Sequence, residues 1–306
     1  MRNGGDLMNS KRLLLIYNPN SGMKTIAKKL SDIVDVFTKG GYSVTVHPTQ
    51  RRLDCLETVS ENCKGDYDRI VIAGGDGTLN EAVNGFMAAD FGGSFGYIPC
   101  GSTNDFSKSV GIPTRTLDAA KTALDGVPFV CDLGRLNDRY FTYVAAFGTL
   151  AEVSYSTPQN AKNQLGFSAY ILEGLASIPS MTSYKLSFES EERSGKGDYI
   201  LGLILNTIHV GGMKIRGVED IRLDDGQFEV LLIKNPKNTT ELNHIISSVM
   251  KLDFDNEYMD GFKTSKITLR CQTPIAWTVD GEKGGEFKET TVEVKEKALR
   301  VLVKKR

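Results

Sequence analysis

Glycines and one aspartate stand between an apolar run and a helix-like run at residues 70–81. Ile70–Ala73 predicts a buried strand, Gly74–Thr78 (GGDGT) follows it, and a helical pattern begins straight after. Glycines let a backbone turn sharply and let phosphate oxygens approach its N–H groups, and the helix N-terminus adds unpaired donors. The segment therefore predicts a phosphate-binding loop, with the Asp76 carboxylate facing the pocket.

The alternative for this loop is a plain strand–turn–helix connection in which Asp-Gly supplies the turn. The coincidence of strand, loop and helix start favours phosphate binding. Two further loops support it: Asn18–Gly22 after the strand Arg12–Tyr17, and Pro99–Phe106 after the strand Phe95–Ile98. Alone, each of these would equally well be an ordinary turn. Neither the GxxxxGK[ST] nor the GxGxxG pattern fits any of the three loops.

The elements that position these loops alternate between strands and helices in the first third of the chain. We expect strands at 12–17, 42–46, 69–73 and 95–98 and helices at 24–39, 53–63 and 78–87. This alternation predicts a parallel sheet with helices on both faces, and the three loops then leave its carboxyl edge, where open α/β sheets bind ligands.

Beyond about Leu133 the pattern changes to mostly strands. We expect strands at 140–146, 183–191, 199–206, 228–233, 266–271, 276–280 and 299–303, a hairpin turn at 191–197, and helices at 163–178 and 240–251. Several of these strands alternate polar with apolar residues, which is typical of an antiparallel sheet. A second, largely antiparallel β domain is the prediction.

Composition excludes several classes of protein. The formal net charge of −1 gives no overall attraction to nucleic acid or to an anionic membrane. Five cysteines without metal-ligand spacing indicate reduced thiols in a cytosolic protein. The sequence also shows no apolar run of signal-peptide type or of membrane-spanning length.

In their order and spacing, the three loops resemble the diacylglycerol kinase catalytic family, and most closely its soluble bacterial lipid kinases. The resemblance extends from Asn18–Gly22 to Val279–Glu282. It implies an α/β nucleotide-binding domain at 9–133, to which 297–306 could be joined, and a β-sandwich substrate domain at 134–296. It also implies ATP and Mg²⁺, and the transfer of a phosphoryl group from ATP to diacylglycerol. The N-terminal residues are polar and include glycines, so we expect a disordered extension at 1–8.

The resemblance also implies which residues contact the nucleotide and its magnesium. Those assigned to the nucleotide phosphates and their metal are Asn18, Pro19, Asn20, Ser21, Gly22, Thr49, Gly74, Gly75, Asp76, Gly77, Thr78, Leu79, Asn80, Ser102, Asp105 and Asp132. Ser102 stands where relatives usually have Thr, and it keeps the hydroxyl. Asp76, Asp105 and Asp132 match the acidic residues that organise the magnesium and water network.

Glu282 matches the family's general base, which accepts the proton of the attacking hydroxyl. Asp76 is the competing assignment for this role. Without the resemblance, Asp280-Gly281-Glu282 reads as a hairpin turn. A second acidic turn, Arg222–Gln227, would by itself be a solvated turn. The resemblance implies that it binds a structural Mg²⁺ through the carboxylate of Asp225 and the main-chain oxygens of Arg222 and Gln227.

The expected partner is a lipid substrate reached by peripheral contact with a membrane, in a cytoplasmic protein that could be a homodimer; nucleic acid is not expected. The candidate basic contacts are Lys24, Lys28, Lys29, Lys162, Lys214 and Arg216. Three alternatives stay open: a kinase for another lipid alcohol such as a sphingoid base, an NAD kinase, and a non-catalytic nucleotide-binding regulator.

Overall fold

The computed structural model describes residues 11–21, 25–65, 67–148, 182–207, 209–210, 213–214 and 222–305. The chain divides into two compact units. Unit 1 is made of residues 1–130 and 299–306, and unit 2 of residues 131–298. The expected extension at 1–8, the expected helix at 163–178, and Gly22, Lys24, Lys162 and Arg216 lie outside the described residues.

Unit 1 contains a parallel sheet in the order β2–β1–β3–β4. Its strands are β1 (Lys11–Tyr17), β2 (Tyr42–Pro48), β3 (Arg69–Gly74) and β4 (Gly96–Pro99). β1 and β3 are buried over most of their length, which explains their unbroken apolar runs. Beyond β4, Phe95 pairs in parallel with Val301, so the end of the chain joins this unit.

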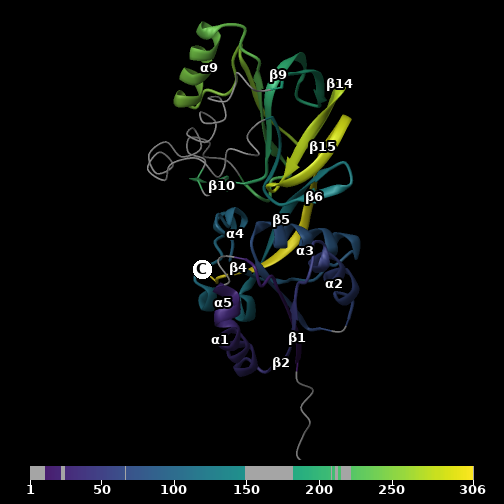
Figure 1. The fold of residues 1–306 in the computed structure, drawn as a ribbon, viewed down its shortest axis with the longest axis vertical. Coiled ribbons are helices and arrows are strands. Elements are labelled where there is room, and N and C mark those ends of the chain that lie inside the picture. The colour runs from purple at the N-terminus through teal and green to yellow at the C-terminus, as the bar shows by residue number, and fades with distance from the viewer. Residues whose placement is uncertain are drawn as a thin grey trace, which may run out of the picture. The chain divides into compact units, whose positions relative to one another are not determined.

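The helices of unit 1 cover both faces of the sheet, with α1 packed beside α5 and α2 beside α3 (Figure 1). They are α1 (Thr25–Lys39), α2 (Asp54–Asn62), α3 (Asp76–Ala88), α4 (Asp105–Val110) and α5 (Thr116–Asp125). Parallel strands followed by helices that cover both faces of the sheet give the α/β architecture expected from the sequence. The carboxyl ends of β1, β3 and β4 all lie at one edge, because the strands are parallel.

Unit 2 is an antiparallel sheet in which β13, β12, β9, β7, β14, β15, β5 and β6 follow one another. β8 pairs with β9 and β14, the same two strands that flank β7. Its strands are β5 (Val127–Leu136), β6 (Arg139–Phe141), β7 (Val144–Phe147), β8 (Tyr184–Ser190), β9 (Ser194–Leu205), β12 (Phe228–Lys234), β13 (Met259–Thr264), β14 (Lys266–Val279) and β15 (Glu282–Val303). A separate short pair consists of β10 (His209–Val210) and β11 (Met213–Lys214).

The sheet of unit 2 curls around one apolar core, and a second apolar core lies on its other face. Phe141 of β6 stacks on Phe228 of β12 with 5.7 Å between ring centroids, although five strands of the ordered path separate them. This contact requires strong curvature, and Trp277 lies fully buried in the same cluster. On the other face, α9 (Thr239–Lys251) buries Ile245 and Val249 against the sheet. The antiparallel second domain predicted from the sequence is confirmed.

Several element boundaries differ from the sequence expectations. The single strand expected at 140–146 is two strands, because the backbone at Thr142 and Tyr143 turns to bind the Asp280 carboxylate. The strands expected at 266–271 and 276–280 are one strand with an irregular register between Arg270 and Ile275. The sequence reading missed β5, β13, α4 and α5, whose mixed or short apolar patterns carry little periodicity.

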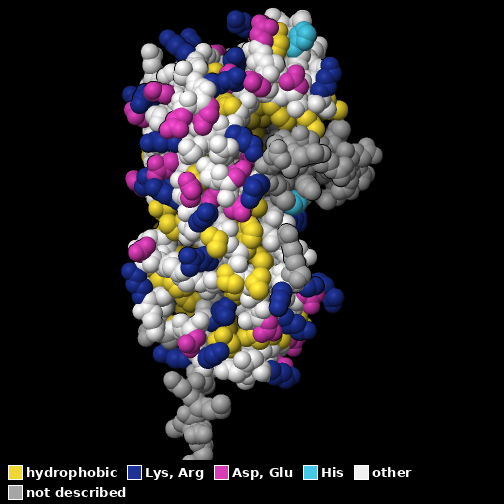
Figure 2. Space-filling view, turned by 180° about the vertical axis from the view of Figure 1, so that it is seen from behind, with side chains coloured by type: hydrophobic (Ala, Val, Ile, Leu, Met, Phe, Trp, Pro, Cys, Tyr) yellow, Lys and Arg dark blue, Asp and Glu magenta, His cyan; other side chains and the backbone are white. Residues whose placement is uncertain are grey.

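Charge is mixed over the surface. Acidic and basic side chains are interspersed on the face that Figure 2 displays, in agreement with the net charge of −1. Among the helices of the described residues, none has the length and apolar character needed to cross a bilayer.

Candidate active site

The first and second loops are joined by direct hydrogen bonds. Asn18 donates its backbone N–H to the carbonyl oxygen of Ala73 at 2.9 Å, and its side-chain amide donates to Thr78 Oγ1 at 3.2 Å. The N–H of Gly75 donates to Ser21 Oγ at 3.3 Å. Asn18 also accepts the N–H of Asn20 at its own Oδ1, which closes the turn. The two loops expected at the carboxyl edge of the sheet therefore form one structure.

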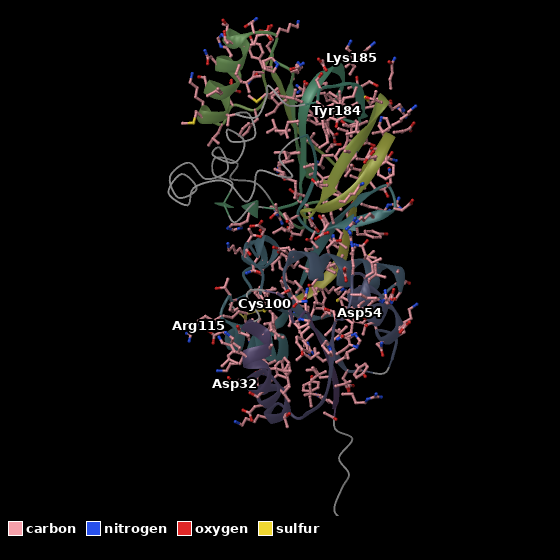
Figure 3. The ribbon with its side chains drawn as sticks, viewed as in Figure 1. Asp32, Asp54, Cys100, Arg115, Tyr184 and Lys185 are labelled. Atoms are coloured by element: carbon pink, nitrogen blue, oxygen red, sulfur yellow. The ribbon has the colours of Figure 1, made fainter. Side chains whose placement is uncertain are left out.

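The third loop is joined to the second through Asp76. Asp76 Oδ2 accepts hydrogen bonds from Thr103 Oγ1 at 2.9 Å and from the N–H of Asn104 at 3.1 Å. The N–H of Cys100, a residue labelled in Figure 3, donates to the carbonyl oxygen of Gly74 at 2.8 Å. Asn104 adopts a left-handed conformation (φ 52°), and its side chain closes the loop on Gly101. All three loops thus meet around the start of α3.

Two glycines make this meeting possible. A Cβ on Gly101 would lie 2.9 Å from the Cα of Gly75 and 3.0 Å from Asn104 Oδ1. A Cβ on Gly75 would lie 3.2 Å from the Cα of Gly101. The second and third loops therefore touch backbone to backbone. A side chain at position 101 would force the backbone to shift, and one at position 75 would be tightly crowded.

The remaining residues expected at the nucleotide lie in the same unit, except Asp132. Thr49 follows β2 and donates its N–H to the carbonyl oxygen of Tyr17 at 2.9 Å. Asp105 begins α4 directly after Asn104 and is buried, while Ser102 is exposed. Leu79 and Asn80 are buried within the first turns of α3, and Pro19 lies between Asn18 and Asn20 in the first loop. Gly77, one residue after Asp76, belongs to the first turn of α3.

Asp132 belongs to unit 2, unlike Asp76 and Asp105. It is buried, and its two carboxylate oxygens accept backbone N–H groups: Oδ1 from Lys297 at 2.7 Å and Oδ2 from Gly226 at 2.8 Å. The resemblance assigns Asp132 to the magnesium network, and this assignment stays a prediction. Within unit 2, its contacts join Asp132 to the acidic turn that contains Asp225.

The acidic turn spans Arg222 to Gln227. Asp225 Oδ1 accepts the N–H of Gln227 at 3.2 Å, and its Oδ2 lies 3.7 Å from Lys263 Nζ. The Arg222 guanidinium pairs with Asp224, not with Asp225. Within the described residues, no group of three or more His, Cys, Asp or Glu side chains is placed to hold a metal. A cation here would depend on one carboxylate with main-chain oxygens and water, as Mg²⁺ sites often do.

Glu282 is the first residue of β15 and follows a two-residue hairpin loop. Val279 pairs with Glu282, and the loop residues Asp280 and Gly281 both have positive φ (49° and 81°), which is a type I′ turn. The buried Asp280 carboxylate accepts the N–H groups of Thr142, Tyr143 and Val144 at 2.7–3.2 Å, and also the Thr142 hydroxyl. The hairpin turn and the candidate base therefore occupy the same segment, and Glu282 is half-exposed.

Comparison with known proteins identifies the family. Residues 12–136 match the model of the diacylglycerol kinase catalytic domain. A protein of Bacillus subtilis named diacylglycerol kinase is 33% identical over 277 residues, covering 90% of this chain and 91% of that protein. A diacylglycerol kinase of Staphylococcus saprophyticus is 32% identical over 278 residues, covering 90% of each. The chain belongs to the diacylglycerol kinase catalytic family.

The fold is that of its family relatives. A crystal structure of a diacylglycerol kinase from Bacillus anthracis superimposes with a TM-score of 0.73 at 18% identity, covering 96% of this chain and 97% of that one. This likeness extends over both units, so the parallel and the antiparallel parts belong to one family architecture. The family assignment made from the three loops is confirmed.

Thr103, Asn104 and Asp280 are site residues that the sequence reading did not single out. Thr103 and Asn104 hold the Asp76 carboxylate, and Asp280 holds the turn before Glu282. The available signal for Asn104 was its position directly before Asp105 in a loop already assigned to the site. Asp280 offered only its Asp-Gly turn dipeptide.

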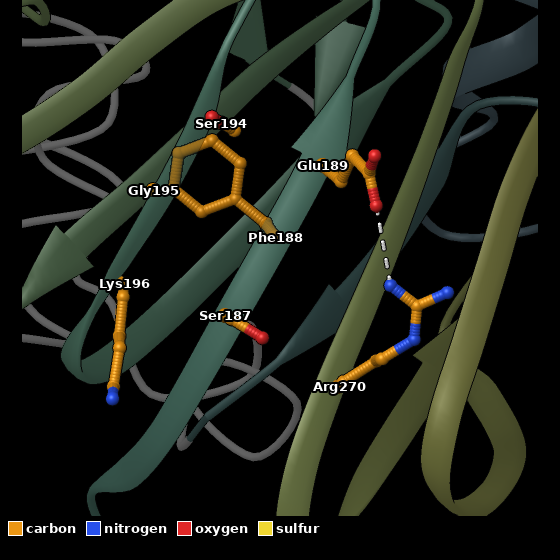
Figure 4. Close-up of a pocket in the computed structure, with 7 residues that line it drawn as sticks. All are labelled: Ser187, Phe188, Glu189, Ser194, Gly195, Lys196 and Arg270. Carbon is orange, nitrogen blue, oxygen red and sulfur yellow. Dashed lines mark hydrogen bonds and ion pairs between the residues drawn. The ribbon is translucent and has the colours of Figure 1, made fainter.

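An open hollow of about 490 Å³ lies elsewhere in unit 2, between β8, β9 and β14 (Figure 4). Arg270 and Glu189 form an ion pair of 3.3 Å across it. Its lining residues are Ser187, Phe188, Glu189, Ser194, Gly195, Lys196 and Arg270. None of the residues predicted for this family's chemistry lines the hollow.

Proposed function

We propose that this protein is an ATP-dependent lipid kinase that transfers the γ-phosphate of ATP to the hydroxyl of diacylglycerol, giving phosphatidic acid, with Mg²⁺. The observation that carries the proposal is the joining of three strand-end loops around the start of α3 by the side chains of Asn18, Ser21 and Asp76. The names of the relatives supply the acceptor class.

The residues present fit a nucleotide's phosphates. Gly75 precedes α3 and has no side chain with which to cap the helix, so its N-terminus is not closed by the residue at the cap position. Phosphate oxygens are good partners for the N–H groups at a helix N-terminus. Because Gly75 and Gly101 have no side chains, neither residue places side-chain atoms at this edge of the parallel sheet. We expect the backbone from Gly74 to Thr78 to bind and orient the phosphates, with Asn18 and Ser21 fixing the loop.

The donor chemistry also fits Mg²⁺, which prefers carboxylate, carbonyl and water oxygens. Mg²⁺ bound at the phosphates would neutralise their charge during transfer. Asp76 and Asp105 are the carboxylates of unit 1 that would hold it. Asp225, with the carbonyl oxygens of Arg222 and Gln227, would hold the second, structural ion.

Glu282 is the better candidate for the general base. Asp76 Oδ2 already accepts two hydrogen bonds, from Thr103 and Asn104, and these stabilise its ionised form. Asp76 is therefore suited to provide a fixed negative charge and to keep the second and third loops together. Glu282 is half-exposed on a rigid hairpin whose turn is fixed by Asp280. We expect Glu282 to accept the proton of the lipid hydroxyl as the new P–O bond forms.

The lipid acceptor requires contact with a membrane surface. We propose a cytoplasmic protein that binds the membrane peripherally, with Lys28 and Lys29 of α1 among its basic contacts. A homodimer is proposed as the assembly, from the resemblance to the family.

The test is a transfer assay with radiolabelled ATP and Mg²⁺ against phosphatidylcholine vesicles that contain diacylglycerol or a sphingoid base, and against NAD in solution. We expect label in a lipid that migrates with phosphatidic acid. Label on the sphingoid base alone or on NAD alone would replace the proposed acceptor. Nucleotide binding without any transfer would indicate a non-catalytic regulator.

A further inference from the structure

The hollow between β8, β9 and β14 collects polar side chains from one face of the sheet. Ser187 of β8 pairs with Arg270 of β14 on one side and with Lys196 of β9 on the other. Residues that lie directly opposite each other on antiparallel strands point to the same face of the sheet. In Figure 4 the Ser187 side chain accordingly lies between those of Lys196 and Arg270. A hydroxyl between two cations is an arrangement that suits an anion.

Two of these three side chains are not used by the fold. Among the described residues, no ion pair or side-chain hydrogen bond involves Lys196 or Ser187. Asp198, two residues along the same face of β9, accepts the side-chain amide of Asn235 at 2.9 Å instead of pairing with Lys196. The ammonium of Lys196 and the hydroxyl of Ser187 are therefore available as donors to a ligand.

Arg270 is oriented by two exposed carboxylates. Its Nη1 lies 3.3 Å from Glu189 Oε2, and its Nη2 lies 3.4 Å from Glu289 Oε1. The two glutamates are 71% and 61% exposed, and ion pairs in such positions contribute little free energy. Because a guanidinium has five N–H donors, these contacts leave three for a further acceptor. An anion with more charge than a carboxylate can therefore replace Glu189 at the guanidinium.

The hollow is open and its walls are polar. Its volume of about 490 Å³ falls within the range of roughly 300–1,000 Å³ that is typical of small-molecule sites. The Phe188 ring belongs to the buried core, and a Cβ on Gly195 would lie 2.5 Å from that ring. The ligand would meet charged and hydroxyl groups, so a polar headgroup fits this hollow and an acyl chain does not.

We propose that this hollow binds a phosphate group through Arg270, Ser187 and Lys196, and that the phosphate displaces Glu189 from Arg270. A phosphate monoester carries a charge of about −1.5 to −2 at pH 7 and offers three acceptor oxygens, which matches the three donor groups. The phosphate can belong to the headgroup of an anionic lipid or be free in solution. The site goes beyond the proposed phosphoryl transfer and includes none of the residues assigned to it.

The test uses the whole protein and two probes. Calorimetry measures the affinity for inorganic phosphate, and flotation measures binding to phosphatidylcholine vesicles with and without phosphatidic acid. Lys196→Gln should weaken binding of the phosphate group roughly 10-fold, and Ser187→Ala roughly threefold. Glu189→Gln should strengthen it roughly two- to fivefold, because the competing carboxylate is removed. The phosphate loops of unit 1 are the same in all of these variants, so differences between them report on the hollow.

Lys251→Gln and Glu257→Gln are the matched controls. Both residues are exposed in unit 2 and lie outside the hollow, and their substitution makes the same changes of charge as Lys196→Gln and Glu189→Gln. Both controls should bind the two probes like the wild type. None of the altered side chains is buried, so we expect all the variants to fold.

The two probes identify the source of the phosphate. A loss of vesicle binding in Lys196→Gln without a loss for inorganic phosphate indicates a lipid headgroup, the reverse indicates a soluble phosphate, and a loss for both shows that the phosphate group is sufficient. The proposal is overturned if Lys196→Gln binds both probes like the wild type, if Lys251→Gln has an effect of equal size, or if Glu189→Gln does not strengthen binding. None of these measurements requires phosphoryl transfer, so a failed kinase assay would reject the proposed function without affecting this result.

Discussion

Asp76 and Glu282 use their carboxylates in different ways. Asp76 is held by Thr103 and Asn104 of the neighbouring loop, whereas Glu282 opens a strand directly after a two-residue turn. A fixed, hydrogen-bonded carboxylate suits charge neutralisation, and a half-exposed one suits proton transfer. The proposed division of roles predicts different kinetic effects for substitutions of the two residues.

We predict that Glu282→Gln lowers kcat by about 10²- to 10⁴-fold and leaves the KM for ATP unchanged, because it removes only the proton acceptor. Asp76→Asn should lower kcat and also raise the KM for Mg-ATP. Steady-state kinetics over a range of ATP and Mg²⁺ concentrations separate the two. Glu286→Gln, an exposed carboxylate on the same strand, is the control. Unchanged turnover in Glu282→Gln would remove the base assignment.

At the scale of elements, the contact between the second and third loops depends on Gly101. We predict that Gly101→Ala weakens nucleotide binding by roughly 10-fold, because its Cβ would push against Gly75 and Asn104 and part the loops. Titration with a fluorescent ATP analogue measures this. Gly92→Ala, where a Cβ would meet no atom within 4 Å, should bind normally. If Gly101→Ala and Gly92→Ala bind the ATP analogue with equal affinity, nucleotide binding does not depend on the close contact between the two loops.

The strand pair β12–β13 contains an unusual carboxylate. Glu229 lies opposite Lys263, with 3.2 Å between Oε1 and Nζ, and its Oε2 is buried without a hydrogen-bond partner. Burial raises the pKa of Glu229 to about 7, and the ammonium of Lys263 offsets only part of this. A folded-state pKa above the unfolded value gives stability that is complete below about pH 4.5 and is lost as the pH rises through about 7.

Glu229→Gln should remove this dependence. Compared with the wild type, we expect the variant to gain on the order of 1–3 kcal/mol in its free energy of unfolding between pH 5 and pH 8. Urea unfolding in EDTA at both pH values measures the difference. Glu189→Gln, which removes an exposed partner of Arg270, should show no comparable change. A difference for Glu229→Gln that does not vary with pH would contradict the assignment.

The elements that the sequence predicted well are those whose burial is uniform. β1 and β3 are apolar along their length because helices cover both faces, so their ends and the loops that follow could be located. β5 mixes polar and apolar residues, and its pairing depends on β15, which lies far along the chain. The loop contacts of Thr103 and Asn104 could not be predicted, because they depend on how α4 begins.

At the scale of the whole molecule, the sequence indicated two units but not the partners of Asp132. Its assignment to the magnesium network stays a prediction, and the contacts that the fold adds lie within unit 2, with Gly226 and Lys297. Long-range backbone contacts of this kind leave no local pattern. The sequence singled out Asp132 by its residue type and motif, but its contact partners could be identified only from the fold.

Each unit has its own set of buried residues, and we expect the two units to unfold in separate transitions. Trp277 is the one tryptophan of the chain and is buried in unit 2, whereas five of the six helices in the described residues lie in unit 1. We predict that ATP at 100 times its dissociation constant stabilises unit 1 by about 2.7 kcal/mol and delays the loss of helical signal. The fluorescence transition of Trp277 should not move. A parallel shift of both signals would show that the units unfold together.

The pairing of Phe95 with the last strand has a consequence for biosynthesis. Phe95 exchanges hydrogen bonds with Arg300 and Leu302 at 3.1 and 2.9 Å, so unit 1 is completed by residues that are translated after all of unit 2. When residues 1–130 have been translated, the edge of the sheet at β4 is still unpaired. It stays unpaired until some 170 further residues have been translated (299 − 130 = 169). During that interval the nascent chain is exposed to chaperones and to mispairing, and nucleotide is expected to bind firmly only after the chain has left the exit tunnel.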